Sequence, residues 1–137
     1  MTTPIQDSIR ALAFFQDKIT FTTGPVELEH QIKDGENIVI VDVRDADDYA
    51  KGHIPGAINV PRGTWDDPQG LEKGKVNIVY CYTQTCHLGA HACAVFAAKS
   101  YPVMELEGGF AAWKDNDFET EIGVSRRGMK GEQAFSR

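Results

Sequence analysis

The sequence predicts one α/β domain with a mostly parallel central sheet and helices on both faces. Three observations support this fold class. Runs of β-branched residues lack the alternation of half-buried strands, which is typical of strands buried on both faces, and helical patterns alternate with these runs along the chain. The chain has 137 residues, a length that suits one well-packed domain and is too short for two.

The start of the chain predicts a helix that precedes the domain. Thr3 and Gln6 have the spacing of a capping box, and Pro4 between them suits a first helical position. Apolar residues then recur at helical spacing, namely Ile5, Ile9, Leu12 and Ile19. We expect this helix to pack on the domain's own core. Because Phe14 and Phe15 do not both fit one stripe, a dimerising helix is the alternative interpretation.

The next elements are a helix and the first clear strand. A second helix is predicted over residues 25–34, with proline at its start and glycine after its end. The β-branched run 37–43 predicts a buried strand. Acidic residues at the start of 45–51 suit the dipole of a short helix, and residues 57–60 predict a short extended segment.

The second half of the chain repeats the alternation. After a polar loop over 62–74, residues 76–80 predict a second buried strand. The alanine-rich segment 86–99 predicts a helix, 102–106 a third strand, and a last helix begins with residues 110–113. The domain therefore spans residues 21–120, between a helical extension over 1–20 and a tail over 121–137.

The composition excludes several classes of protein. No window approaches the roughly 18 apolar residues of a membrane span, and the start of the chain lacks the basic and apolar parts of a signal peptide. The net charge of −6 argues against a nucleic-acid surface. Three cysteines cannot all pair with one another, so a secreted disulfide framework is not expected. We expect a cytoplasmic protein that binds neither membranes nor nucleic acids.

Cys81 stands at the position where an α/β sheet forms its sites, directly after a strand end. Residues 81–86 lead from that strand to a helix start, and such a loop can curl so that backbone N–H groups point inward. These groups favour the thiolate, which is the nucleophilic form. We therefore predict a reactive Cys81 rather than the inert, buried cysteine that is common in apolar surroundings.

Three segments resemble the signatures of the rhodanese-like domain family, in its order and spacing. They are Tyr49-Ala50-Lys51-Gly52-His53-Ile54-Pro55-Gly56-Ala57 after Asp42-Val43-Arg44, Tyr80-Cys81 with the loop that follows, and Leu106-Glu107-Gly108-Gly109-Phe110-Ala111-Ala112-Trp113. The likeness covers about residues 21–118.

The resemblance implies a single-domain sulfurtransferase of the thiosulfate sulfurtransferase type. In that family the cysteine at the position of Cys81 takes a sulfane sulfur from thiosulfate or a persulfide and passes it to a thiol or another nucleophile. Such a covalent intermediate implies ping-pong kinetics. We expect no metal or other cofactor. The expected partners are a small sulfur donor and a thiol acceptor, either a small molecule or a protein, and the chain is expected to be a monomer or a homodimer.

The loop after Cys81 departs from the family pattern. The expected substrate-binding residues are Tyr82, Thr83, Gln84, Thr85, Cys86 and His87, and none is a lysine or arginine. Many family members carry a cation in this loop, commonly at the position of Cys86. We therefore expect weak thiosulfate binding, with a persulfide or a protein partner as the better donor. Arg44 is a candidate for orienting an anionic donor, although an ion pair with Asp42 is the favoured interpretation.

The other cysteines and histidines allow further interpretations. Cys86 is a candidate resolving thiol that could close a disulfide with Cys81, or else a small residue at the helix start, and Cys93 is expected in the core. His87 and His91 have the spacing of zinc ligands on a helix, but the cysteine spacing disfavours a metal site. His53 is expected to fix its turn through hydrogen bonds to the backbone.

Three other functions are alternatives to a sulfurtransferase. Phosphatases and arsenate reductases of a related fold use Cys-x5-Arg, whereas His87 stands at the arginine's position here. A sulfur carrier or regulatory binding module without turnover is another alternative, and residues 1–20 would be its docking surface. The third is a thiol redox protein that uses Cys81 and Cys86.

Overall fold

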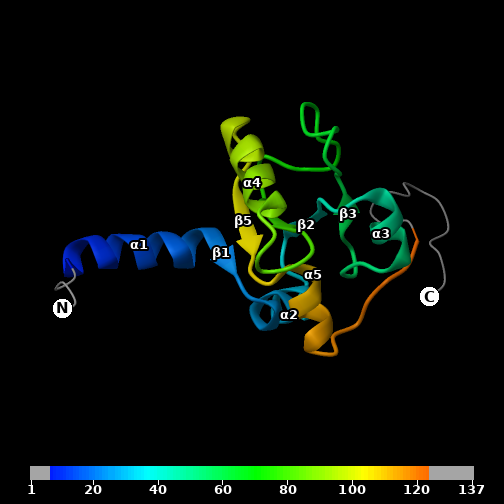
Figure 1. Ribbon diagram of the computed structural model, residues 1–137, viewed down its shortest axis with the longest axis horizontal. Coiled ribbons are helices and arrows are strands. Elements are labelled where there is room, and N and C mark those ends of the chain that lie inside the picture. Colours follow the sequence, from blue (N-terminus) through cyan, green and yellow to red (C-terminus); the bar gives the residue numbers. More distant parts are fainter. Residues whose placement is uncertain (1–6, 124–137) are drawn as a thin grey trace.

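The computed structural model describes residues 7–123. Five parallel strands form one sheet in the order β1-β5-β4-β2-β3 (Figure 1). Their bounds are Thr22–Thr23 for β1, Ile38–Asp42 for β2, Ile58–Asn59 for β3, Val76–Tyr80 for β4 and Val103–Leu106 for β5. The predicted parallel sheet is confirmed, and β1 is an edge strand that no sequence pattern indicated.

The helices lie close to their predicted positions. Their bounds are Ser8–Phe21 for α1, Pro25–Lys33 for α2, Ala46–Lys51 for α3, Leu88–Ala98 for α4 and Gly109–Asp115 for α5. Helix α4 begins later than expected, because the residues after Cys81 form a longer loop. That loop ends at the helix N-cap, His87.

Both faces of the central strands are buried, which explains why their sequences do not alternate. On one face, Val39 and Val79 pack in a cluster with Phe96 of α4. On the other face, Ile40 and Ile78 pack in a cluster that also contains residues of α2, α3 and α5. Helices therefore cover both faces, as predicted, and Cys81 belongs to the α4 side of the sheet.

Helix α1 does not pack on the core of its own domain, and this expectation was wrong. It contains no buried residue, and it projects away from the edge of the sheet (Figure 1). The physical reason is that β1 pairs at the edge of the sheet directly after α1 ends, so no face of the sheet lies beside the helix. One contact with the domain is an ion pair, with Lys18 Nζ 2.7 Å from Glu107 Oε2.

The start of α1 is capped by a different residue from the one expected. The side chain of Asp7 accepts hydrogen bonds from the N–H groups of Ile9 and Arg10, which is the usual role of an N-cap carboxylate. The predicted capping box at Thr3 lies outside the described residues, as does most of the predicted tail. No helix in the described part of the chain is long and apolar enough to cross a membrane.

Candidate active site

Cys81 lies directly after β4 and is only 3% exposed. The backbone N–H groups of Tyr82 and Gly89 act on its sulfur and lower the pKa of the thiol. The cradle of N–H donors that the loop sequence predicted is therefore present, and one of its two donors comes from the first turn of α4. This arrangement can stabilise negative charge as it develops on the sulfur.

Gly89 allows α4 to approach the sulfur. A Cβ atom at this position would lie 3.4 Å from Cys81 Sγ and 2.9 Å from Glu105 Oε2. Sequence reasoning did not single out Gly89 or Glu105. The available signal for Gly89 was a glycine inside an alanine-rich helix. Glycine there destabilises the helix by about 1 kcal/mol relative to alanine, so its presence indicates a close contact that excludes a side chain.

Helix α5 holds the loop from its other side. The N–H of Phe110 donates to the carbonyl oxygen of Cys81 at 2.9 Å, and the N–H of Ala111 donates to that of Tyr82 at 3.0 Å. Gly109 has a φ of +59°, and a Cβ there would lie 2.7 Å from the Cys81 carbonyl oxygen. The Gly108-Gly109 turn is therefore required both for its backbone conformation and for its close approach to the loop.

Burial raises the pKa of the Cys81 thiol to about 11. The N–H groups of Gly89 and Tyr82 act against this effect, and the neighbouring Cys86 thiol adds to it. The sulfur donates to the carbonyl oxygen of Cys86 at 3.4 Å. The two backbone donors favour the thiolate, as predicted, but desolvation outweighs them and shifts the pKa upward.

The remaining loop residues separate into two groups. One group lines a cavity of about 180 Å³ and consists of Thr83, Gln84, Cys86 and His87. Thr85 is exposed, and its hydroxyl oxygen lies 3.3 Å from that of Thr83. Tyr82 turns the other way, and its hydroxyl donates to Asp48 Oδ2 at 2.6 Å. The loop therefore presents Cys86 and His87 to the cavity, while Cys81 lies behind them.

The cavity walls are acidic. Glu105 and Glu107 line it, and no lysine or arginine is among the described residues that do so. Burial, with a smaller effect of Glu107, raises the pKa of Glu105. An anionic ligand here would meet two carboxylates, with no lysine or arginine among the described lining residues to compensate their charge.

The sequence matches the family model of the rhodanese-like domain over residues 24–116. The chain belongs to the rhodanese-like domain family. This match covers strand β4, Cys81 and its loop, and the glycine turn that holds the loop.

Similar proteins include enzymes and a regulator. The thiosulfate sulfurtransferase GlpE of Pseudomonas putida is 32% identical over 95 residues, which are 69% of this chain and 86% of that protein. The HTH-type transcriptional regulator Rv0324 of Mycobacterium tuberculosis is 34% identical over 89 residues, 64% of this chain and only 39% of the regulator. The crystal structure of the BH2092 protein from Bacillus halodurans has 35% identity and a TM-score of 0.79, covering 88% of this chain and 90% of its own.

In this rhodanese-like domain, Arg44 forms the ion pair expected with Asp42. Its Nη2 lies 2.8 Å from Asp42 Oδ2, and its Nε contacts both carboxylate oxygens at 3.1 Å. The guanidinium also lies 4.2 Å from the ring centre of Phe110. Arg44 lines a second cavity of about 300 Å³ together with Lys51 and Lys114. Its role in orienting a donor stays a prediction.

The family's histidine turn has a structural role. His53 Nδ1 lies 2.8 Å from the Tyr49 carbonyl oxygen, as expected, and Nε2 lies 3.2 Å from Glu121 Oε1. The backbones of His53 and Glu121 also exchange two hydrogen bonds of 2.9 Å. The chain is thus packed as far as Glu121, which sequence reasoning had placed at the start of the tail.

Cys93 is a packed side chain of α4, and the described residues form no metal site. Cys93 is partly buried and packs against the cluster beneath α4, and burial raises its pKa to about 12. Over residues 7–123, no group of three or more histidine, cysteine or acidic side chains could hold a metal ion.

Proposed function

We propose that this rhodanese-like domain is a sulfurtransferase that carries a sulfane sulfur as a persulfide on Cys81. The observation that supports it best is the place of Cys81 at the carboxyl end of β4, where the N–H groups of Tyr82 and Gly89 act to lower the pKa of its thiol. Donors placed where charge develops lower the barrier of such a reaction without reorganising.

The reaction has two displacement steps. The Cys81 thiolate attacks the outer sulfur of a donor persulfide, the donor's S–S bond breaks, and the donor leaves as a thiolate. An acceptor thiolate then attacks the outer sulfur on Cys81, and Cys81 leaves as the thiolate. Because burial raises the pKa of the Cys81 thiol to about 11, the thiol first loses its proton to water, and the reaction proceeds through the small fraction of thiolate.

The surroundings of Cys81 favour a persulfide over thiosulfate as donor. The loop has no cationic side chain, and the adjacent cavity has carboxylates from Glu105 and Glu107. Thiosulfate carries two negative charges and would be repelled there, whereas a persulfide on a neutral or ammonium-bearing small molecule would not.

Intact-mass spectrometry tests this proposal. We expect a gain of one sulfur after exposure to polysulfide or a small persulfide, a smaller gain with thiosulfate, and no gain in Cys81→Ser. Cys86→Ser is the matched control and keeps the gain. Loading that persists in Cys81→Ser contradicts the proposal. Repeated turnover with a small thiol distinguishes an enzyme from a carrier that accepts sulfur only once.

A thiol redox function is the second candidate, and the contact between Cys81 and Cys86 supports it. The Cys86 thiolate would attack the inner sulfur of the Cys81 persulfide, form the Cys81–Cys86 disulfide and expel hydrosulfide, and a cellular thiol would then reduce the disulfide. A loss of two hydrogens with release of sulfide, absent in Cys86→Ser, is the expected signature. A persulfide that survives without acceptor in the wild-type protein contradicts it.

A further inference from the structure

The projecting helix α1 has one apolar stripe that no described part of the chain covers. Ile9, Leu12, Phe15 and Ile19 recur at steps of three and four residues, so they lie along one side of the helix. They are 79%, 59%, 54% and 76% exposed. Soluble domains rarely leave such a surface in contact with water unless it binds a partner.

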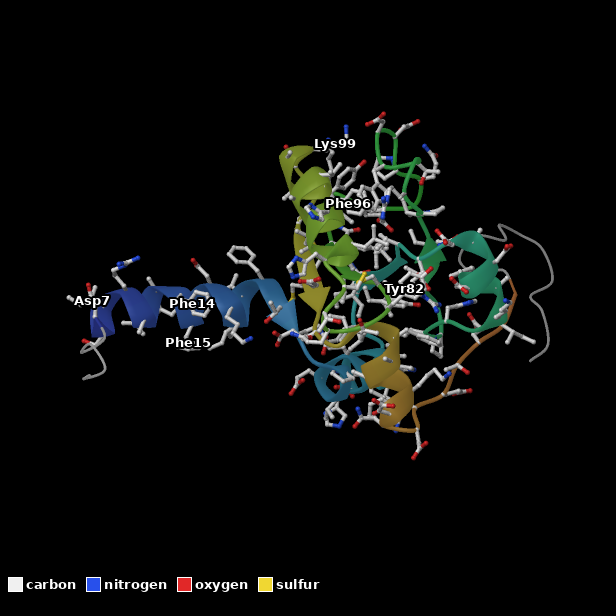
Figure 2. All side chains as sticks on the ribbon, viewed as in Figure 1. Asp7, Phe14, Phe15, Tyr82, Phe96 and Lys99 are labelled. Atoms are coloured by element: carbon white, nitrogen blue, oxygen red, sulfur yellow. The ribbon has the colours of Figure 1, made fainter. Side chains whose placement is uncertain are left out.

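The other side of α1 carries its charged side chains together with two exposed rings, those of Phe14 and Phe21. At 3.6 residues per turn, Arg10, Asp17 and Lys18 lie away from the stripe, and Lys18 contacts Glu107 of the domain. Figure 2 shows the helix extending away from the domain, and the ring centroids of Phe14 and Phe15 on it lie 5.1 Å apart. The stripe itself contains no charged side chain, and Ser8 and Gln16 are its polar neighbours.

We propose that α1 is a dimerisation helix whose stripe pairs with the same stripe of a second copy of this chain. Two identical stripes without charges meet without like-charge repulsion. A membrane surface fits less well, because helices that lie on membranes have a polar face rich in lysine and arginine. Helix α1 instead carries only two basic side chains and one acidic side chain, and the chain has a net charge of −6. This proposal does not depend on the proposed function.

The two helices pair antiparallel. The domain begins directly after α1, at Thr22, so an antiparallel pair keeps the two domains at opposite ends and opposes the helix dipoles. Ile9 of each copy then lies beside Ile19 of the other, with Leu12 and Phe15 of both at the centre. The stripe ends at Ile19, next in sequence to Lys18, whose partner Glu107 lines the cavity of the candidate active site.

The exposed surface of the stripe is large enough for a specific dimer of moderate affinity. The stripe and its two polar neighbours present on the order of 600 Å² per copy, or about 1,200 Å² for the pair, which is the lower limit of specific interfaces. The dimer is therefore expected to dissociate on dilution.

Sedimentation velocity over a concentration series tests the proposal with two matched variants. Leu12→Glu places a carboxylate in the stripe, and Ala13→Glu adds the same charge at an exposed position outside it. We expect the wild-type protein and Ala13→Glu to approach twice the chain mass of 15.1 kDa at high concentration. Leu12→Glu should remain at the single-chain mass, with unchanged circular dichroism and unchanged sulfur loading.

Three results would overturn the proposal. The first is a wild-type protein that stays at the single-chain mass throughout the series. The second is a Leu12→Glu variant that dimerises as strongly as the wild type, because another surface would then form the dimer. The third is a single-chain protein that cosediments with vesicles of phosphatidylcholine and phosphatidylglycerol through the stripe, since the occupant would then be a lipid surface.

Discussion

Helices α1 and α4 are both rich in apolar side chains, yet one is exposed and the other is packed. In α4, Ala92 and Phe96 are completely buried against the sheet, whereas α1 contains no buried residue. The difference comes from position, because α4 connects β4 to β5 across one face of the sheet while α1 precedes the edge strand. Apolar spacing thus shows that a helix face needs cover, but not whether its own domain provides that cover.

The largest expected effect is the loss of unfolding free energy when a buried side chain of α4 is removed. Phe96→Ala removes a completely buried ring that also lies 6.0 Å from the ring of Trp65, and we expect a loss of about 3–5 kcal/mol in the free energy of unfolding. Phe14→Ala removes an exposed ring that contacts only the neighbouring ring of Phe15 among the aromatic side chains described, and it should change the free energy of unfolding by less than about 0.5 kcal/mol. Urea unfolding monitored by fluorescence measures both, and similar losses would refute the contrast between the helices.

A smaller effect is expected where α5 packs against the active-site loop. Gly109→Ala puts a Cβ against the Cys81 carbonyl at a positive φ, so we expect a loss of about 1–3 kcal/mol in unfolding free energy and slower sulfur loading. Gly35→Ala is the control, since Gly35 also has a positive φ but nothing within 4 Å of its Cβ position. Equal sulfur loading by the two variants would show that the close approach to the loop is unimportant.

The reactivity of Cys81, which the first turn of α4 covers, should depend steeply on pH. With a pKa of about 11, the thiolate fraction is about one in ten thousand at pH 7 and rises tenfold per pH unit. Alkylation of Cys81 by iodoacetamide, followed by peptide mass spectrometry in Cys86→Ser, should keep rising to about pH 11. A plateau below pH 8 would mean that the N–H donors outweigh burial.

The smallest effect is expected at the start of α1. Asp7→Ala removes the N-cap hydrogen bonds to Ile9 and Arg10 and should weaken the helix locally by about 0.5–2 kcal/mol. Because α1 buries nothing, faster hydrogen exchange should be confined to α1, and the unfolding midpoint of the dilute protein should stay unchanged. Asp17→Ala is the control, and a midpoint shift seen only in Asp7→Ala would mean that α1 supports the domain.

The sequence predicted the central elements well because their signals are local. The strands β2 and β4 are runs of β-branched residues, and the loop after Cys81 is bounded by one of them and by an alanine-rich helix. Strand β1 left no signal, since Thr22 and Thr23 are a strand only through pairing with Glu105 and Leu106. Short edge strands depend on their partner, not on their own residues.

The candidate site was predicted only in part for a similar reason. Cys81 and its loop are contiguous in sequence, so their position after a buried strand was sufficient to single them out. Glu105, Gly89 and Gly109 come from three other elements, and their roles arise from approaches to Cys81 of a few ångströms. Spacing along the chain contains no information about such approaches.

By itself, the sequence determined the α/β fold class, the place of Cys81 at a strand end and the absence of a cation from its loop, because each depends on neighbouring residues. The tertiary structure decided that α1 projects with its stripe uncovered. It also decided that burial raises the pKa of the Cys81 thiol. Both depend on burial, which is set by contacts between residues far apart in the chain.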